Sequence, residues 1–187
     1  MPTEAMPAAE AVRPLLRVRQ VREFTDEAPS DAQLAAIADA GRWSGSASNE
    51  QPWRFIVIRD RATLARFAEA GMPQTRLLTT APAAIAVALP DDEERPFARA
   101  YDEGRAVERM LVAAHLVGLA GGIGWVRKGV AAPFVEALAV PQGWTIHTIL
   151  AVGHPSEAAK APKSKPGEAR LPREQTVFEE RWPADEA

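Results

Sequence analysis

The chain contains three long apolar runs that end in polar or turn-forming residues. They span residues 53–60, 83–90 and 144–155, and β-branched or aromatic side chains are frequent in the first and the last. Such side chains favour extended structure, and an unbroken apolar run is typical of a strand covered on both faces. The pattern therefore predicts three buried strands, the second of which is stopped by Pro90.

Helical signals lie before and between these runs. Ser30 followed by Gln33 is the N-terminal signature of a helix, and Gly41 suits the end of that helix. Further helices are predicted over residues 10–18, 61–71, 105–122 and 132–139.

The longest predicted helix, residues 105–122, has no polar face over residues 110–120 except at His115. A helix that is apolar all round is usually buried on every side. This helix is therefore expected to be central or to pack against a second subunit, with His115 as a core or interface residue. Asp102 and Glu103 are expected at its start, where carboxylates favour the helix dipole.

Helices and strands alternate, so we expect an α+β fold with a mixed or mostly antiparallel sheet. Residues 1–9 are rich in proline and alanine and are expected to be disordered, residues 10–178 to form one domain, and residues 179–187 to be a tail. Residues 91–104 are charged and interrupted by proline, which predicts a mobile segment. The chain from about residue 156 is too polar for a core of its own, so it either hangs free or wraps around another body.

Composition excludes several classes of function. The 187 residues carry a net charge of -3 and an acidic pI of about 5.7, so we expect no nucleic-acid partner. No apolar run is long enough for a membrane span, and the N-terminus lacks a secretory signal. There is no cysteine, which fits a cytoplasmic protein, and the three histidines are not at metal-ligand spacing, so no metal is expected.

Two polar segments are candidates for ligand binding. Arg17, Arg19 and Arg22 are close enough in sequence to hold a phosphate through charge-assisted N–H contacts, or else they form a solvated basic helix end. The loop around Ser46 and Asn49 offers hydroxyl, amide and backbone groups suited to the polar edge of a heteroaromatic ring, or else it is an ordinary connection.

The glycine cluster at residues 118–124 does not fit a dinucleotide-binding motif. Such a motif follows a strand and opens a helix, whereas Gly122 and Gly124 follow a predicted helix and Arg127 occupies the third glycine position. The glycines are expected to stop the helix and form a tight turn, or alternatively to let the backbone approach a flat ligand.

The order of these segments resembles the nitroreductase family of FMN-dependent oxidoreductases. Residues 17–60 are similar to the family's Arg-x-x-Arg-x-Phe motif, helix, and Pro-Ser-x-x-Asn-x-Gln-Pro-Trp entry into a strand. Residues 81–89 resemble its Ala-Pro strand, residues 102–126 its Asp-x-Gly central helix, and residues 149–157 its strand ending in Gly-x-Pro. The match is collinear over roughly residues 14–178.

The resemblance implies an intertwined homodimer that packs through the central helix, with C-terminal arms embracing the partner and FMN sites at the interface. Arginines would bind the phosphate, amides and backbone N–H groups would face the ring, and one loop would reach the partner's cofactor. The implied residues are Arg19, Arg22 and Arg170 for the phosphate, Ser46, Ala47 and Asn49 for the partner's flavin, and Gln74, Lys128 and Gly129 for the ring.

The resemblance also implies a ping-pong reaction. FMN would take a hydride at N5 from NADH or NADPH and pass it to a small acceptor such as a nitroaromatic or a quinone, with no catalytic side chain required. Residues 91–101 and the C-terminal tail would select the substrate, and Phe97 and Tyr101 either line its pocket or simply pack. The alternative is a non-catalytic flavin-binding or cofactor-sequestering dimer of the same fold.

Four positions depart from the family pattern. Val18 stands where many members have a first arginine, and Gln20 where many have serine. Gly45 replaces the usual proline, and Arg109 replaces a common asparagine. These departures predict either a phosphate pocket that is built differently from that of other members or a weaker affinity for the cofactor.

Overall fold

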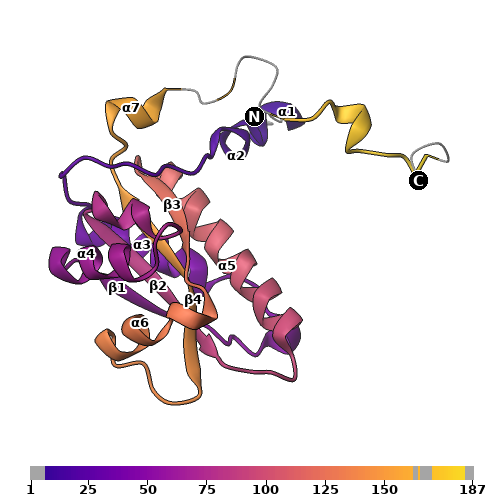
Figure 1. The fold of residues 1–187 in the computed structure, drawn as a ribbon. Helices are drawn as coiled ribbons and strands as arrows, with labels where there is room; N and C mark the ends of the chain where they lie inside the picture. Colours follow the sequence, from indigo (N-terminus) through magenta and orange to yellow (C-terminus); the bar gives the residue numbers. More distant parts are fainter. Residues whose placement is uncertain (1–6, 162–163, 165–169, 184–187) are drawn as a thin grey trace, which may run out of the picture.

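The structure is a computed structural model that describes residues 7–161, 164 and 170–183 (Figure 1). Its centre is a four-stranded antiparallel sheet in the order β1-β2-β4-β3. The strands are β1 (Arg54–Ile58), β2 (Ala83–Pro90), β3 (Ala120–Trp125) and β4 (Trp144–Gly153). The three strands predicted from apolar runs are confirmed as β1, β2 and β4, and the antiparallel form of the sheet is confirmed with them.

Helices cover both faces of the sheet. Helices α3 (Asp31–Arg42) and α5 (Pro96–Leu116) pack on one face, and α4 (Arg61–Ala70) and α6 (Ala132–Ala137) pack on the other. The remaining elements are short: α1 (Ala8–Ala11), α2 (Arg13–Arg17), α7 (Glu157–Lys160), η1 (Ala47–Asn49), η2 (Arg76–Thr79), η3 (Lys128–Val130) and η4 (Arg173–Gln175). Helix α1 begins at Ala8, within the segment expected to be disordered.

The central strand β2 shows why the core has two layers. Successive side chains of a strand point to opposite faces, and Ile85 and Val87 join the core under α3 and α5. Ala84 and Ala86 face the other way, into the core under α4 and α6. Phe67 of α4 stacks on Phe134 of α6 in that second core, with ring centroids 4.4 Å apart.

The start of α3 confirms the predicted capping box. The Ser30 hydroxyl accepts the Gln33 backbone N–H at 3.2 Å, and the Gln33 side chain accepts the Ser30 N–H at 2.9 Å. The predicted stop at Gly41 is wrong, because Gly41 lies inside the helix. A Cβ there would lie 2.9 Å from Cγ of Met110 on α5, so the glycine permits close packing of the two helices.

The limits predicted for the long helix are also wrong at both ends. Helix α5 begins at Pro96, so part of the segment expected to be mobile is helical. Asp102 and Glu103 consequently lie inside the helix, and both are buried. Only part of the apolar stretch is covered by its own chain, since Ala114 faces the core while Leu116 is 64% exposed.

The C-terminal end of α5 was misjudged because a glycine-rich strand follows it. Gly118, with φ 80°, ends the helix in the left-handed conformation, and β3 begins at Ala120. A Cβ at Gly122 would collide with the backbone carbonyl oxygen of Val21. The Val21 N–H in turn donates to the Gly121 carbonyl at 2.8 Å. The glycines therefore let the N-terminal segment lie against the edge strand of the sheet.

Candidate functional site

Three arginines from two distant parts of the chain line one cavity beside the edge strand. This cavity, of about 720 Å³, is lined by Arg17, Arg19 and Arg170 together with Gln20, Ala159 and a single acid, Glu108. Arg19 donates to the backbone carbonyls of Ala159 at 3.0 Å and Ala161 at 3.2 Å, and also to that of Lys160. Arg19 thereby joins the N-terminal motif to the start of the C-terminal arm, and the excess of positive charge suits an anion such as phosphate.

A second cavity adjoins the first. It measures about 370 Å³, and Gln20 and Ala159 line both cavities. Its charged lining consists of Arg22, Arg76 and one acid, Glu23, and Thr79 and Thr80 add hydroxyl groups. Arg76 was not predicted from the sequence. Its position two residues after Gln74, at the start of η2, was the only signal that could have indicated it.

Gln20 shows how a departure from the family pattern is accommodated. Its side-chain oxygen accepts the backbone N–H of Ile123 at 3.3 Å, at the exposed edge of β3. The side chain at this position therefore fixes the N-terminal motif to the strand between the two arginine cavities.

Gln74 brings an unpaired polar atom to the turn before η2. Its Oε1 atom is buried and has no hydrogen-bond partner among the described residues. The neighbouring Thr75 is fully buried and donates its hydroxyl to carbonyls at the end of α4, at 2.9 and 3.0 Å, which fixes the turn. A buried polar atom without a partner is costly unless a ligand or water satisfies it.

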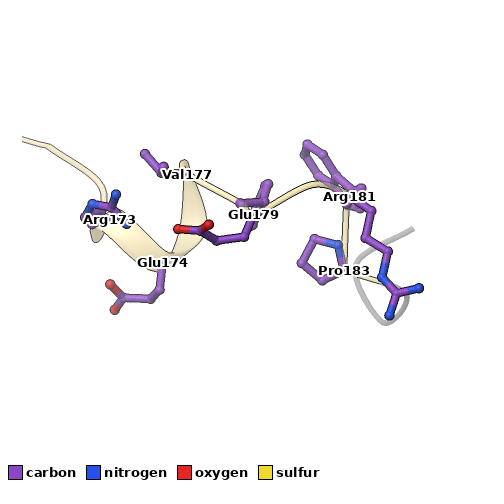
Figure 2. Close-up of a pocket in the computed structure, with 8 residues that line it drawn as sticks. Arg173, Glu174, Val177, Glu179, Arg181 and Pro183 are labelled. Atoms are coloured by element: carbon purple, nitrogen blue, oxygen red, sulfur yellow. The ribbon is translucent and has the colours of Figure 1, made fainter.

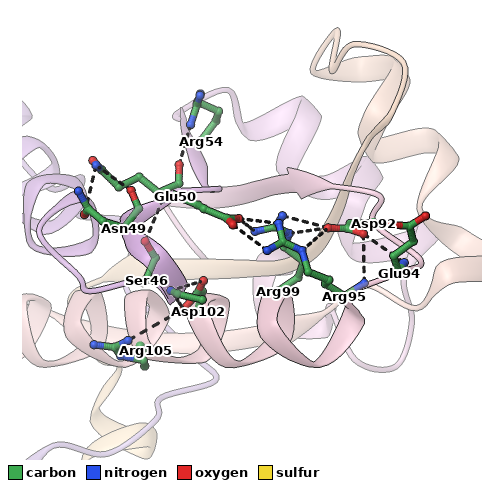
Figure 3. A network of polar contacts seen from close by, with 12 residues as sticks. Ser46, Asn49, Glu50, Arg54, Asp92, Glu94, Arg95, Arg99, Asp102 and Arg105 are labelled. Carbon is green, nitrogen blue, oxygen red and sulfur yellow. Dashed lines mark hydrogen bonds and ion pairs between the residues drawn. The ribbon is translucent and has the colours of Figure 1, made fainter.

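The loop with Ser46, Ala47 and Asn49 lies against the N-terminal half of α5 (Figure 3). Both carboxylate oxygens of Asp102 accept the Ala47 N–H at 3.1 Å, and the Ser46 hydroxyl accepts the Gln51 N–H at 2.9 Å. A Cβ at Gly45 would clash with the Arg105 guanidinium, so a side chain there would require this flexible arginine to move.

This loop and the Arg19 cavity meet α5 on different sides. The loop contacts Asp102, whereas the cavity contacts Glu108. At 100° per residue, six residues turn a helix by about 600°, so the two side chains point roughly 120° apart, and their positions differ by about 9 Å along the axis. No residue of the loop lines the cavity that Arg19 and Arg170 share.

Lys128 and Gly129 follow the end of β3, in η3. The Lys128 ammonium pairs with Glu93 at 3.1 Å, and this contact raises the pKa of the lysine above its usual value. Apart from its two chain neighbours, no described residue has an atom within 4 Å of the position a Gly129 Cβ would take, so the backbone is uncovered on that side.

Phe97 and Tyr101 project from the first turns of α5 and are 81% and 61% exposed. Their rings stack at 6.2 Å, and the Arg105 guanidinium lies 5.8 Å from the Tyr101 ring centroid. Tyr101 lines a shallow hollow on the outer face of α5, together with Gly104 and Arg109. In the single chain the two rings therefore form an outward-facing aromatic surface.

The C-terminal arm makes a hollow from its own residues only. Figure 2 shows its lining, which comes entirely from residues 173–183, including Arg173, Val177 and Arg181. The rings of Phe178 and Trp182 lie 4.8 Å apart, and Trp182 is 64% exposed. Since no other part of the described chain contributes to the hollow, it is the concave side of an extended segment.

Glu103 is a buried carboxyl group between α5 and the sheet. Burial raises its pKa to about 7, which outweighs the opposing effect of a hydrogen bond from Thr148, and its Oε1 atom has no partner among the described residues. It does not line the arginine cavities described above. Its raised pKa makes it a determinant of stability.

We expect Glu103→Gln to remove a pH dependence of folding. Below pH 4.5 the carboxyl is protonated in both states, and between 4.5 and about 7 only the folded state keeps its proton. The stability of the wild-type protein should therefore fall over this window as the pH rises, by about 3 kcal/mol. Urea unfolding at pH 5 and pH 8 should show this loss in the wild type and not in the variant.

The matched control for this experiment is Glu136→Gln on the exposed side of α6. It should keep the wild-type difference between pH 5 and pH 8. An equal pH dependence in Glu103→Gln and the wild type would show that Glu103 is not the group responsible.

Two features, a membrane-spanning helix and a metal-binding cluster, are absent from the described part of the chain. No helix there is long and apolar enough to span a membrane. The same residues contain no group of three or more His, Asp or Glu side chains that could hold a metal ion.

Comparisons with known proteins match the chain over most of its length. A model described as the nitroreductase family matches residues 17–76. A protein of Archaeoglobus fulgidus, assigned by name to the NADH dehydrogenases/NAD(P)H nitroreductases, is 31% identical over 154 residues, covering 79% of this chain and 87% of the relative.

Solved structures share the fold. NfrA2 of B. megaterium superposes with a TM-score of 0.80 at 25% identity, covering 94% of this chain and 76% of that chain. An FMN-dependent nitroreductase of Clostridium difficile superposes with a TM-score of 0.76 at 22% identity, covering 90% of this chain and 98% of that chain.

Proposed function

The chain belongs to the nitroreductase family, and from this premise we propose that it is an FMN-dependent oxidoreductase. In this proposal it transfers a hydride from NADH or NADPH to a small acceptor such as a nitroaromatic or a quinone. The observation that supports it most is the convergence of Arg19 and Arg170 on one cavity, beside a second cavity with Arg22 and Arg76. The name of the Archaeoglobus relative and the FMN dependence in the name of the Clostridium structure agree with this assignment.

The residues present fit FMN. The cavity with Arg19 and Arg170 has the charge that a phosphate requires, and the adjoining cavity shares Gln20 and Ala159 with it. Gln74 lies two residues before Arg76, which lines the second cavity, and its buried Oε1 has no partner among the described residues; a turn of the side chain toward that cavity would let it accept an N–H of the flavin ring. In this assignment Arg19 and Arg170 hold the phosphate, and Gln74 and the backbone of Lys128 and Gly129 orient the ring.

When bound, FMN supplies the redox chemistry itself, accepting a hydride and passing it on. The side chains then have to bind, orient and stabilise charge. Arg22 and Arg76 carry positive charge into the second cavity, where it favours the added negative charge of a reduced ring. No side-chain acid or base is assigned a role in the hydride transfer.

We further propose that the functional unit is a homodimer. The loop of Ser46, Ala47 and Asn49 meets α5 on a different side from the Arg19 cavity, so it would serve the partner's flavin. A set of large apolar side chains is exposed on α5 and on the two terminal segments, and a second copy would cover them. These side chains are Leu15, Leu16, Phe97, Tyr101, Leu116, Leu171 and Trp182.

Phe97 and Tyr101 are proposed to border the substrate position in this dimer. They lie on the same outer surface of α5 as the exposed Leu116, where a partner would approach. Flat, electron-poor acceptors suit such an aromatic border, because they can stack against the rings.

Steady-state kinetics test this function directly. The purified protein, supplied with FMN, is assayed with NADH and with NADPH against a quinone at several fixed concentrations. A shared site predicts parallel double-reciprocal plots, because the nicotinamide leaves before the acceptor binds. Converging plots would contradict the shared site. Protein that binds FMN without any nicotinamide-dependent turnover would instead indicate the non-catalytic, cofactor-holding alternative.

A further inference from the structure

A network of charged side chains ties the loop of residues 46–51 to the first turns of α5 (Figure 3). Arg95 binds Glu50 through two hydrogen bonds, at 2.7 and 2.8 Å. Arg99 donates to Glu50 at 2.8 Å and to Asp92 at 2.9 and 3.2 Å, so it joins the two carboxylates. We call Glu50, Asp92, Arg95, Arg99 and Asp102 the loop clamp.

Asp102 holds the other end of the same loop. Its side chain is buried, and its carboxylate accepts the Ala47 N–H at 3.1 Å. The loop is therefore fixed at Ala47 by Asp102 and at Glu50 by Arg95 and Arg99, all of which belong to α5 or to its N-cap. Two contacts of this kind at either end leave little freedom for the residues between them.

The backbone between these two points, and that of the residue directly after them, adopts a conformation that it would not keep unaided. Ser48, Asn49 and Gln51 have φ values of 50°, 55° and 51°. This left-handed region is unfavourable for residues other than glycine, and several such residues in one loop persist only where the surroundings hold them. In this protein, the contacts of the loop clamp hold these residues in the left-handed conformation.

The clamp is partly shielded from water at its centre. The side chains of Arg99 and Asp92 are 12% and 19% exposed, and that of Glu50 is 31% exposed. The two arginines lower the pKa of Glu50 to about 2, so this carboxyl is ionised at neutral pH. Shielded charge pairs with several hydrogen bonds are screened less by salt than exposed pairs, and they hold one geometry.

We propose that the loop clamp is a positioning device for the flavin-facing loop, with Arg99 and Asp102 as its main positioning residues. The clamp holds Ala47 through its N–H, and it thereby presents the hydroxyl of Ser46 and the amide of Asn49 in a fixed arrangement before the cofactor arrives. Part of the segment assigned to substrate selection, residues 92–99, thus also builds the cofactor site. This proposal rests on the proposed function for the identity of the ligand, but the ordering of the loop does not depend on that ligand.

Arg99→Gln tests the clamp, because it removes the more shielded of the two arginines that join Glu50 to Asp92. In the protein without FMN, we expect hydrogen exchange of the amides in residues 46–51 to accelerate by roughly tenfold or more. FMN Kd should rise by about tenfold, because the bound loop must then be ordered at the expense of binding. The melting temperature should change little, since the loop lies outside both cores.

The control is Arg59→Gln, which removes a comparable arginine that pairs with Asp31 at 2.7 Å, away from the loop. It should alter neither exchange in residues 46–51 nor FMN Kd. Glu50→Gln provides a second route to the same loss if Arg99→Gln folds poorly. The double variant should be little worse than either single change, as expected for partners in one network.

Unchanged exchange of residues 46–51 in Arg99→Gln and Glu50→Gln would overturn the proposal. So would faster exchange with an unchanged FMN Kd, which would make the clamp purely structural. If the wild-type protein did not bind FMN, the proposed function would fail instead, and the exchange measurement would still decide whether the clamp orders the loop.

Discussion

Replacing both Arg19 and Arg170 by alanine is expected to weaken FMN binding by about 10²- to 10⁴-fold. Both side chains line the cavity proposed for the phosphate. A charge-assisted hydrogen bond contributes about 1.5–3 kcal/mol, so two lost contacts amount to about 3–6 kcal/mol. Quenching of FMN fluorescence on titration with protein measures the change in Kd.

Arg19 also has a structural role, and the experiment has to separate this role from phosphate binding. Its guanidinium donates to the carbonyls of Ala159, Lys160 and Ala161, so its loss also loosens the start of the arm. Arg13→Ala, at the start of α2 and outside the cavity lining, is the matched control and should leave Kd unchanged. A double variant that binds FMN within threefold of the wild type would refute the phosphate assignment.

A chain ending at Ala161 is expected to be folded, monomeric and free of flavin. The cut keeps α7 and the three carbonyls that Arg19 binds, so the sheet and its four covering helices stay intact. It removes Arg170 and the exposed apolar side chains Leu171, Val177 and Trp182, which we assign to contact with the partner. Analytical ultracentrifugation measures the mass, and circular dichroism confirms that the body remains folded.

The single variant Arg170→Ala separates the two roles of the arm. It should weaken FMN binding while leaving the dimer intact, because the apolar side chains of the arm are unchanged. A truncated protein that sediments as a dimer and still binds FMN as tightly as the full chain would contradict the embracing-arm proposal.

Local sequence patterns were sufficient for the elements that local chemistry determines. The runs that became β1, β2 and β4 are mostly apolar, and the capping box at Ser30 satisfies backbone groups within four residues of one another. The strand β3 was missed because its glycines are required by contacts distant in sequence. The need for glycine at Gly122 comes from the carbonyl of Val21, which no local pattern reveals.

The start of α5 was predicted at the wrong residue for a related reason. The sequence of residues 91–104 is charged, which predicts a mobile segment as long as the partners of these charges are unknown. Arg95 and Arg99 find those partners in Glu50 and Asp92, and the burial of Asp102 is compensated by the Ala47 N–H. These pairings depend on the fold, so the helix and its network emerge only from the structure.

For the candidate site, the residues alone predicted a basic cluster and a polar loop. Each could equally have been structural, the first a solvated helix end and the second an ordinary connection. The resemblance to a family added Arg170, and the structure supports that addition by placing Arg170 beside Arg19 in one cavity. Arg76 was found only in the structure, because it comes to Arg22 through the packing of η2 beside β3.

The visible absorption spectrum of the purified protein tests the central claim most directly. The protein is incubated with FMN, passed through a desalting column, and measured without air before and after addition of NADH or NADPH. An FMN-dependent oxidoreductase should be a yellow protein that keeps its flavin through the column and is bleached by at least one of the two nicotinamides. A colourless protein that retains no added FMN would contradict this claim.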